Sequence, residues 1–595
     1  MVVDTGFFAV IFFDENIISP QILASLESSI HIQIKQATVF IKVFPDAEIF
    51  QNPSNTITIL TYGHFLNFAS SGELVEQYRI KGESIFSSLN GSFALLLIDR
   101  LQNKVIIVTD RLSSKKIYSY NKNNALFLST ELKYLFDEDL SLDETGLAWY
   151  LSNGVFHQNR TVFREIRSYE RAASYTYDLD YKKKIKSTYW HYNFTHEYES
   201  KNISDIKAEL SELIRNCVES RIHQENPLYI SLSAGFDASG ILGVLNQFGI
   251  SSRLCSFSYG MNETNKENDP YISKIMAQKC QINHNFLLTY DGNIVNSIER
   301  NAEFGNGTTH FCDESLIWQQ LSQFIDHKRF PLMVGDECFG WTDSLLNDSR
   351  DILASCRIRD FSSLDWMNIY LQNGIYDNFL EGQSSDITDL LGSAPKTDDL
   401  DDIKDYIYFD QRLCHVILPW RQYYAGRIFS VYDPFLDNSI IDFMQKIPSK
   451  LRRDKMLYKE TISEMLPEIF SITRAEVKDA TPDWNKEVFR NKEVILDQYF
   501  INNKSSILDQ YLNPDILKNI LNDVTIPNTS NQISKSITNL IYSIIKNSLG
   551  TKSILVTRQL KPFKVTRSVF LIRVLILRRF LEIAKKESMI SSQFI

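Results

Sequence analysis

A short loop between a predicted buried strand and a predicted helix constrains this chain most. The apolar segment Pro227–Leu232 is typical of a buried strand, and the loop that follows contains Ser233, Gly235, Asp237 and Ser239. A helix N-terminus offers unpaired N–H groups, glycine lets the backbone approach an oxyanion, and hydroxyl groups donate further hydrogen bonds. A carboxylate repels bare phosphate, so Asp237 indicates a Mg²⁺ ion that bridges phosphates. The pattern therefore predicts a phosphate-binding loop; the alternative is a strand–helix connection with an ordinary Asp or Ser cap.

The segments around this loop alternate between helix and strand patterns. Helical periodicity covers Ser204–His223, Ile241–Phe248 and Tyr271–Gln281, and Ser252–Tyr259 is typical of a strand. This alternation predicts a parallel α/β sheet. The last third is mostly helical by pattern, and the polar segment Asn522–Ser534 is expected to be a loop.

The chain before Trp190 is rich in strand patterns instead. A helix is expected near Gly72–Gly82, and Asn90-Gly91 and Lys122–Asn124 are turn signals. The expected strands are Phe7–Phe13, Thr56–Leu60, Phe93–Ile98, Val105–Val108 and Ala125–Leu128.

The length and the net charge of the chain limit the number of domains and the kinds of partner that we expect. A chain of 595 residues is too long for one hydrophobic core, so two or more domains are expected. The formal net charge of -10 argues against a broad nucleic-acid-binding surface. The seven cysteines form no C-x-x-C pair, which favours free thiols in a reducing cytoplasm. We expect no signal peptide, because no positively charged region precedes the first apolar stretch. We expect no transmembrane segment, because the apolar stretch Ser568–Ala584 is short and interrupted by charges.

Ordered motifs along the chain resemble the asparagine synthetase family. The loop itself resembles S-G-G-x-D-S-S. In the first domain, Leu89–Ala94 resembles L-N-G-x-F-A, and Asp110–Tyr118 resembles D-R-F-G-x-K-P-L-Y. Phe127–Lys133 resembles F-A-S-E-x-K, and Thr161–Ile166 and Tyr189-Trp190 resemble the end of that domain.

The second domain continues the resemblance. Asp336–Gly340 resembles D-E-x-F-G, Asp433–Asp437 resembles R-x-P-F-L-D, and Lys455–Lys459 resembles K-x-x-L-R. Lasso peptide cyclases and β-lactam synthetases are relatives of this family. The resemblance implies an α/β protein with two domains. Residues 1–195 would form a degenerate glutaminase-like αββα sandwich, and residues 200–595 an ATP pyrophosphatase-type parallel α/β domain with a helical C-terminal part.

The resemblance also implies site residues, with ATP and Mg²⁺ as cofactors. Lys455, Asp237 and Glu337 would be catalytic, and Asp237 and Asp336 would be metal ligands. Lys455 would hold the polyphosphate, because a cation stabilises negative charge that develops in the reaction; the alternative is a solvated surface lysine. The implied nucleotide-binding set is Leu232, Ser233, Ala234, Gly235, Phe236, Asp237, Ala238, Ser239, Phe257, Ser258, Tyr259 and Gly335.

Departures from the family pattern alter the expected chemistry. A glutaminase of this type needs an N-terminal cysteine, but Met1 is followed by Val2 and no cysteine precedes Cys217, so thiol-based glutamine hydrolysis in the first domain is excluded. His64 is interpreted as a loop histidine. Ala234 and Ala238 replace glycine and serine; Ala234 is tolerated only with a negative φ, and the hydroxyl lost at Ala238 removes about 1 kcal/mol of hydrogen bonding. The second loop, Leu332–Glu337, lacks S-G-x-G.

The sequence therefore predicts an ATP-dependent, AMP-forming amide ligase without glutaminase activity. A small-molecule or peptide carboxylate would be activated as an acyl-adenylate, and ammonia or an amine would attack it. A lasso-peptide-type macrocyclase, an ammonia-dependent asparagine synthetase and a non-catalytic binding protein stay open, as do a homodimer and a peptide-processing partner.

The C-terminal segment 552–586 is strongly basic. It is interpreted as a helix packed on the synthetase domain with solvated basic residues. Contact with an acidic partner, a peptide substrate or an anionic membrane surface is the alternative.

Overall fold

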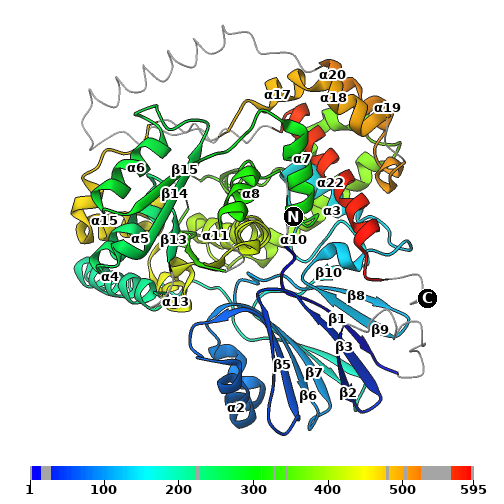
Figure 1. The fold of residues 1–595 in the computed structure, drawn as a ribbon, viewed down its shortest axis with the longest axis horizontal. Coiled ribbons are helices and arrows are strands. Elements are labelled where there is room, and N and C mark those ends of the chain that lie inside the picture. Colours follow the sequence, from blue (N-terminus) through cyan, green and yellow to red (C-terminus); the bar gives the residue numbers. More distant parts are fainter. Residues whose placement is uncertain are drawn as a thin grey trace.

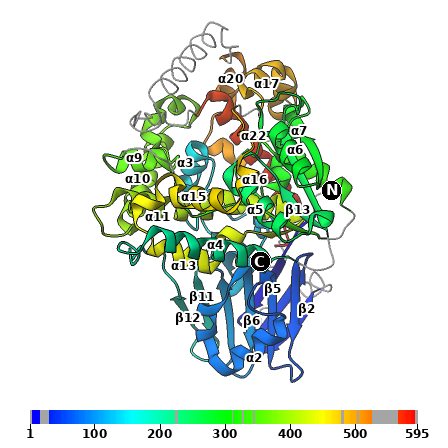
Figure 2. The same ribbon diagram turned by 90° about the vertical axis from the view of Figure 1, so that its left-hand side faces the viewer.

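The computed structural model describes residues 3–14, 29–222, 227–309, 311–325, 329–341, 346–476, 481–501, 505–523 and 565–590. Two antiparallel sheets stack in one lobe, and a parallel sheet surrounded by helices forms the other (Figure 1). The view turned by 90° shows the helices of the second lobe lying over one end of the two stacked sheets (Figure 2).

The first lobe is a sandwich of two six-stranded sheets, antiparallel throughout. One sheet has the order β10 (Arg167–Ser168), β8 (Tyr118–Lys122), β9 (Ala125–Ser129), β1 (Phe7–Phe12), β3 (Ala37–Val43), β2 (Ile30–Ile34). The other has the order β12 (Lys183–Thr188), β11 (Ala173–Asp178), β7 (Lys104–Thr109), β6 (Gly91–Asp99), β5 (Ile57–Phe65), β4 (Ala47–Gln51).

Strand β1 contributes side chains to two hydrophobic cores, one on each face of its sheet. Phe7 and Ile11 belong to the core between the two sheets, whereas Phe8 and Val10 belong to the core on the opposite face. A strand buried on both faces has no polar alternation, which is why its sequence is a continuous apolar run. Helix α2 (Ser71–Lys81) covers the outer face of the second sheet, and α3 (Glu144–Asn153) packs in the core outside the first. The predicted αββα sandwich is confirmed.

The two turn signals have different outcomes. Asn123 and Asn124 have φ values of 49° and 60° and join β8 to β9 as a tight hairpin, as predicted. Asn90-Gly91 is no hairpin turn, because Gly91 begins β6. Its φ of 141° and the closeness of the His64 carbonyl oxygen require glycine for close strand approach.

The second lobe contains the predicted parallel sheet. Its order is β15 (Asn283–Leu288), β14 (Leu254–Gly260), β13 (Leu228–Ser231), β16 (Pro331–Met333), β17 (Ser430–Tyr432). Helices α4 (Ile203–Glu219), α5 (Phe236–Gln247), α6 (Asp269–Lys279), α7 (Ile294–Phe304) and α8 (Ser315–Phe324) connect or cover these strands. The chain moves outward from β13 to β14 and β15, then returns to β16 on the other side of β13. Ligands bind at the carboxyl ends of strands at such a reversal.

The described part of the last third is helical outside β17, as predicted. Between β16 and residue 523, the α-helices of the described residues are α9 (Ser349–Ser355), α10 (Ile375–Ser393), α11 (Leu400–Ile407), α12 (Leu418–Tyr423), α13 (Asn438–Lys446), α14 (Ser449–Arg452), α15 (Met456–Met465), α16 (Pro467–Phe470), α17 (Trp484–Arg490), α18 (Lys492–Leu496), α19 (Pro514–Leu517) and α20 (Asn519–Asp523). The segment Tyr408–Ile417 between α11 and α12 is a π-helix. The predicted loop Asn522–Ser534 lies outside the described residues after Asp523.

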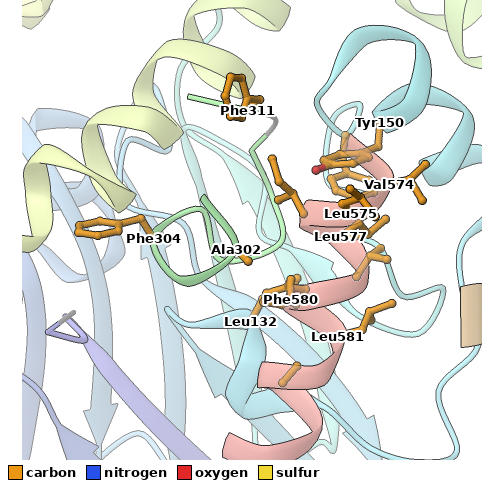
Figure 3. Close-up of a cluster of buried hydrophobic side chains, with 14 of the residues drawn as sticks. Leu132, Tyr150, Ala302, Phe304, Phe311, Val574, Leu575, Leu577, Phe580 and Leu581 are labelled. Atoms are coloured by element: carbon orange, nitrogen blue, oxygen red, sulfur yellow. The ribbon is translucent and has the colours of Figure 1, made fainter. Parts of the chain in front are cut away.

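The final helix, α22 (Arg567–Glu587), packs against both lobes. It contacts α7, α3 and the 3₁₀ turn Leu132–Leu135. In Figure 3, Leu575, Leu577 and Phe580 lie among Tyr150, Leu132 and Ala302 in one apolar cluster.

The basic residues of α22 correct one prediction. Arg573 and Arg578 are buried rather than solvated; Arg573 donates to the Leu151 carbonyl oxygen at 2.7 Å and Arg578 pairs with Asp509 at 3.0 Å. Residues 552–564 lie outside the described residues. Within the described part of the chain, none of the helices has the length and apolar character needed to cross a membrane.

Candidate functional site

The predicted phosphate loop joins β13 to α5 at the carboxyl edge of the parallel sheet. Gly235 is exposed at the start of α5, whose first turn has no side-chain cap. The backbone N–H of Ala234 donates to Asp269 Oδ1 at 2.8 Å, and Ser239 Oγ donates to the Ser233 carbonyl oxygen at 3.1 Å. Ala234 has no positive φ, so its methyl group is tolerated there. These two hydrogen bonds thus fix the shape of the loop, and Gly235 remains exposed.

Arg474 also anchors this loop, and the sequence patterns did not single it out. Its Nη1 donates to the Ala234 carbonyl oxygen at 2.6 Å and to Ser239 Oγ at 3.1 Å. The guanidinium lies close to both rings of the stacked pair Phe236 and Phe470, at 4.7 and 4.4 Å from their centroids. Burial lowers the pKa of Arg474, and its Nη2 is buried without a hydrogen-bond partner among the described residues. That nitrogen is a spare donor beside the loop.

The three residues predicted to be catalytic meet at the mouth of the loop. Lys455 Nζ lies 2.8 Å from Asp237 Oδ2 and 2.9 Å from Glu337 Oε1. Burial disfavours the ammonium, but Glu337 and Asp237 more than compensate, so the pKa of Lys455 is raised. Burial raises the pKa of Glu337 against the opposing effect of Lys455. Lys455 therefore forms ion pairs with both Asp237 and Glu337 and is not a solvated surface lysine.

The backbone before α15 aims Lys455 inward. Asp454 and Lys455 have φ values of 52° and 58°, a left-handed conformation that costs free energy for residues with a Cβ. Such strain is retained where the surrounding structure over-determines it, and here the lysine is held by two carboxylates.

Asp237 and Asp336 have different partners. Asp237 Oδ1 is buried without a hydrogen-bond partner, whereas both oxygens of Asp336 accept from Arg421, at 2.7 and 3.0 Å. Gly335 packs directly on Asp237, because an added Cβ would lie 3.0 Å from the Asp237 Cβ. The free oxygen of Asp237 suits a hard cation such as Mg²⁺, which needs only one or two carboxylates beside phosphate oxygens. Among the described residues no group of three or more His, Cys, Asp or Glu is arranged around a metal position.

A second carboxyl group lies beside Asp336. Both oxygens of Asp433 are buried without hydrogen bonds among the described residues, and burial together with Asp336 raises its pKa well above the usual range. The pKa of Arg421 is raised by Asp336 and Glu314 despite burial. Arg421 and Asp433 come from α12 and the end of β17, so the sheet brings together groups that are distant in the chain.

The predicted nucleotide residues on β14 lie beside the loop, but their side chains have internal partners. Leu232 N–H donates to the Phe257 carbonyl oxygen at 2.8 Å, which joins the two strand ends. Ser258 Oγ bonds His284 Nε2 at 3.0 Å, and Tyr259 donates to Glu314 Oε1 at 2.7 Å. These residues therefore shape the edge of the site through their backbone and packing.

Two acidic residues before α8 extend the site, and no motif pointed to them. Glu314 is close to Arg421 and Tyr259, and burial raises its pKa. Asp313 accepts from Trp484 Nε1 at 2.9 Å, and burial together with Glu314 raises its pKa to about 7. In sequence both lie in an irregular segment without a recognisable spacing.

The first-domain motifs form the joint between the lobes. Asn90 Nδ2 donates to Asp437 Oδ2 at 3.1 Å, and Arg111 pairs with Asp442 at 2.6 Å. His64 is not a loop residue: it lies in β5 opposite Ser92, and its ring is 4.2 Å from that of Tyr432. Lys115 lies 3.5 Å from Asp46 in the same region.

Two family profiles match the chain in the order of the two lobes. A profile described as "Glutamine amidotransferase domain" matches residues 57–190, and one described as "Asparagine synthase" matches residues 209–324.

Several curated proteins are similar to parts of this chain. The putative glutamine-hydrolyzing asparagine synthetase 2 of Methanocaldococcus jannaschii is 24% identical over 225 residues, 37% of this chain and 43% of that protein. The glutamine-hydrolyzing asparagine synthetase 1 of Bacillus subtilis is 26% identical over 206 residues, covering 34% and 32%. The amidase chry2 of Gibberella zeae is 25% identical over 179 residues, covering 29% and 26%. The matched regions span less than half the length of each relative.

Proposed function

Because this chain is an asparagine synthetase-like protein, we propose that it is an ATP-dependent, AMP-forming amide ligase that does not hydrolyse glutamine in its first domain. The observation that carries the proposal is Lys455, held by Asp237 and Glu337 at the mouth of a phosphate-type loop. The boundary between a first domain at 1–195 and a second at 200–595 belongs to the same proposal, as does a cytoplasmic location.

The proposed reaction has two steps. A substrate carboxylate oxygen attacks the α-phosphorus of ATP, the bond from that phosphorus to the bridging oxygen breaks, and pyrophosphate leaves. An amine nitrogen then attacks the acyl carbon, loses a proton, and expels AMP. Since the first domain has no cysteine, the nitrogen comes from free ammonia or from a substrate amine.

The residues of this chain have distinct roles in that scheme. The exposed Gly235 and the first turn of α5 would receive phosphate oxygens, and Lys455 would stabilise charge on the leaving pyrophosphate. Asp237 would hold Mg²⁺ through its unpaired oxygen, and Asp336 would add a second contact once released from Arg421. Mg²⁺, when bound, would neutralise negative charge on the phosphates.

A second candidate function is nucleotide binding without turnover. Both oxygens of Asp336 are occupied by Arg421, and a bidentate guanidinium–carboxylate pair is strong. A macrocyclase and an ammonia-dependent asparagine synthetase are versions of the first candidate that differ in their acid and amine.

Isotope exchange between pyrophosphate and ATP, measured with a panel of carboxylic acids, tests the proposal. We expect acid-dependent exchange in the natural chain and a loss of at least about a hundredfold in Asp237→Asn and Lys455→Ala. Lys518→Ala is the control, because Lys518 pairs with Asp515 at 2.7 Å and belongs to none of the groups predicted to form the site.

The other outcomes separate the candidates. ATP binding without exchange for any acid supports the second candidate, and absence of ATP binding overturns both. Aspartate- and ammonia-dependent AMP formation identifies an ammonia-dependent synthetase.

A further inference from the structure

A cavity of about 410 Å³ lies between the two lobes, apart from the site described above. Its first-lobe wall includes Lys116, Arg171 and Trp190, and its second-lobe wall includes Asp410 and His415 of the π-helix. None of the residues predicted to bind nucleotide or metal lines it. A π-helix is rare and frequently accompanies a functional site.

Most charges around this cavity are paired. Arg171 lies 3.0 Å from Asp410, and Lys186 on the exposed rim lies 2.5 Å from Glu170. Lys116 differs: its side chain makes no hydrogen bond or ion pair with the described residues, although the residue is only 6% exposed. Its backbone N–H donates to Gln422 Oε1 at 2.8 Å, which fixes its position.

An ammonium group in this position is costly without a counter-ion. Burial lowers the pKa of Lys116, with a further lowering by Arg171, while Cys414, Asp110 and Asp410 act in the opposite direction. Burial and Lys116 together lower the pKa of His415 well below its usual value. The cavity therefore contains a positive charge without a close counter-ion, and a bound anion would compensate this charge.

We propose that this cavity binds a small organic anion that carries one carboxylate or phosphate group, with Lys116 as its charge partner. The lining contains three cationic side chains, Lys116, Arg171 and Lys186, against the carboxylates Glu170 and Asp410, and this excess of positive charge favours an anion. Its volume is that of a small-molecule site, and the rings of Trp190 and Tyr406 offer apolar contact.

The position of Lys116 in the sequence agrees with a role particular to this chain. In the pattern D-R-F-G-x-K-P-L-Y, the place of Lys116 is occupied by proline, which has neither charge nor backbone N–H. The lysine therefore contributes the charge, and its amide makes the contact with Gln422, which is one residue from Arg421 in α12.

The test uses benzoate, phenyl phosphate and neutral benzamide as probes of the full-length protein, by calorimetry and thermal unfolding without ATP. We expect benzoate or phenyl phosphate to bind and raise the Tm, and benzamide to have no effect. Lys116→Met is expected to weaken binding by roughly tenfold or more, as for loss of one charge-assisted hydrogen bond. Lys104→Met is the control and is expected to keep binding, because Lys104 pairs with Glu83 at 3.1 Å and does not line the cavity.

The unliganded variants give an independent measurement. Lys116→Met is expected to have a Tm equal to or above that of the natural chain, because an unpaired buried ammonium is removed. Lys116→Gln repeats the test if the methionine variant does not fold. The proposal is overturned if neither anion binds, if benzamide binds equally well, or if anion binding survives both Lys116 substitutions, which would place the anion elsewhere.

Discussion

Single carboxyl groups in this site have different surroundings and different partners. Glu337 faces Lys455, Asp336 faces Arg421, and Asp433 has no hydrogen-bond partner among the described residues. Desolvation disfavours the charged form, and an adjacent cation restores it. Burial together with Asp336 raises the pKa of Asp433, which favours a protonated Asp433 beside two acids that have cationic partners.

Asp313 allows a prediction about pH. Its folded pKa of about 7 lies above the ordinary value of 3.8, so the folded state binds more protons than the unfolded state between these values. The stabilising contribution of protonated Asp313 is therefore lost as pH rises towards 7. Asp313→Asn, which keeps an acceptor for Trp484, is expected to raise the Tm more at pH 8 than at pH 5. An equal change in Tm at both values would contradict this assignment.

At the scale of elements, the loop after β16 and the turn before α15 are interlocked. Gly340 has a φ of 111°, and a Cβ there would overlap the Arg452 carbonyl oxygen. Arg452 is buried and pairs with Asp405 at 3.0 Å and with Asp402. The backbone that carries Glu337 thus rests on the segment that leads to Lys455, which sets the two side chains at ion-pair distance.

Gly340→Ala tests this interlock. Strained backbone and overlap are expected to cost about 2 kcal/mol or more of unfolding free energy and to weaken ATP binding. Gly392→Ala is the matched control: it lies in α10, an added Cβ meets nothing within 4 Å, and helix propensity predicts a gain of up to about 1 kcal/mol. Urea unfolding followed by circular dichroism measures both; a Gly340→Ala midpoint equal to that of the natural chain would refute the interlock.

The elements were more predictable from sequence than the site. Runs such as Phe7–Phe13 and turns such as Asn123-Asn124 depend on local periodicity and backbone preference, which the sequence displays directly. Asp237, Glu337 and Lys455 were identifiable because they lie in recognisable motifs. Arg474 and Arg421 were not, because each reaches the site from a segment without a local signature and gains its role only through tertiary contact.

In the whole molecule, buried charged residues join the first lobe to the second. Arg427 of the second lobe forms two hydrogen bonds with Glu131 of the first, at 2.8 and 2.9 Å, and both residues are buried. Asp4 lies 3.3 Å from the same guanidinium. The first lobe, which has no thiol nucleophile, is thereby joined to the second lobe through buried charges.

Breaking this joint has a predictable cost. Arg427→Met leaves Glu131 buried without its cation and is expected to lower the unfolding free energy by about 3–5 kcal/mol. The double variant Arg427→Met with Glu131→Gln is expected to recover part of the loss, because the uncompensated charge is removed. Chemical unfolding of both variants measures this; no recovery in the double variant would contradict the charge argument.

The position of α22 has a consequence for biosynthesis. Leu575, Leu577 and Phe580 fill the space beside Leu132 and Tyr150, hundreds of residues earlier in the chain. While the ribosome is still translating the middle of the message, that apolar surface of the first lobe has no cover. We therefore expect this surface to be exposed to aggregation until α22 has been synthesised, and we expect chaperones that act during translation to bind it.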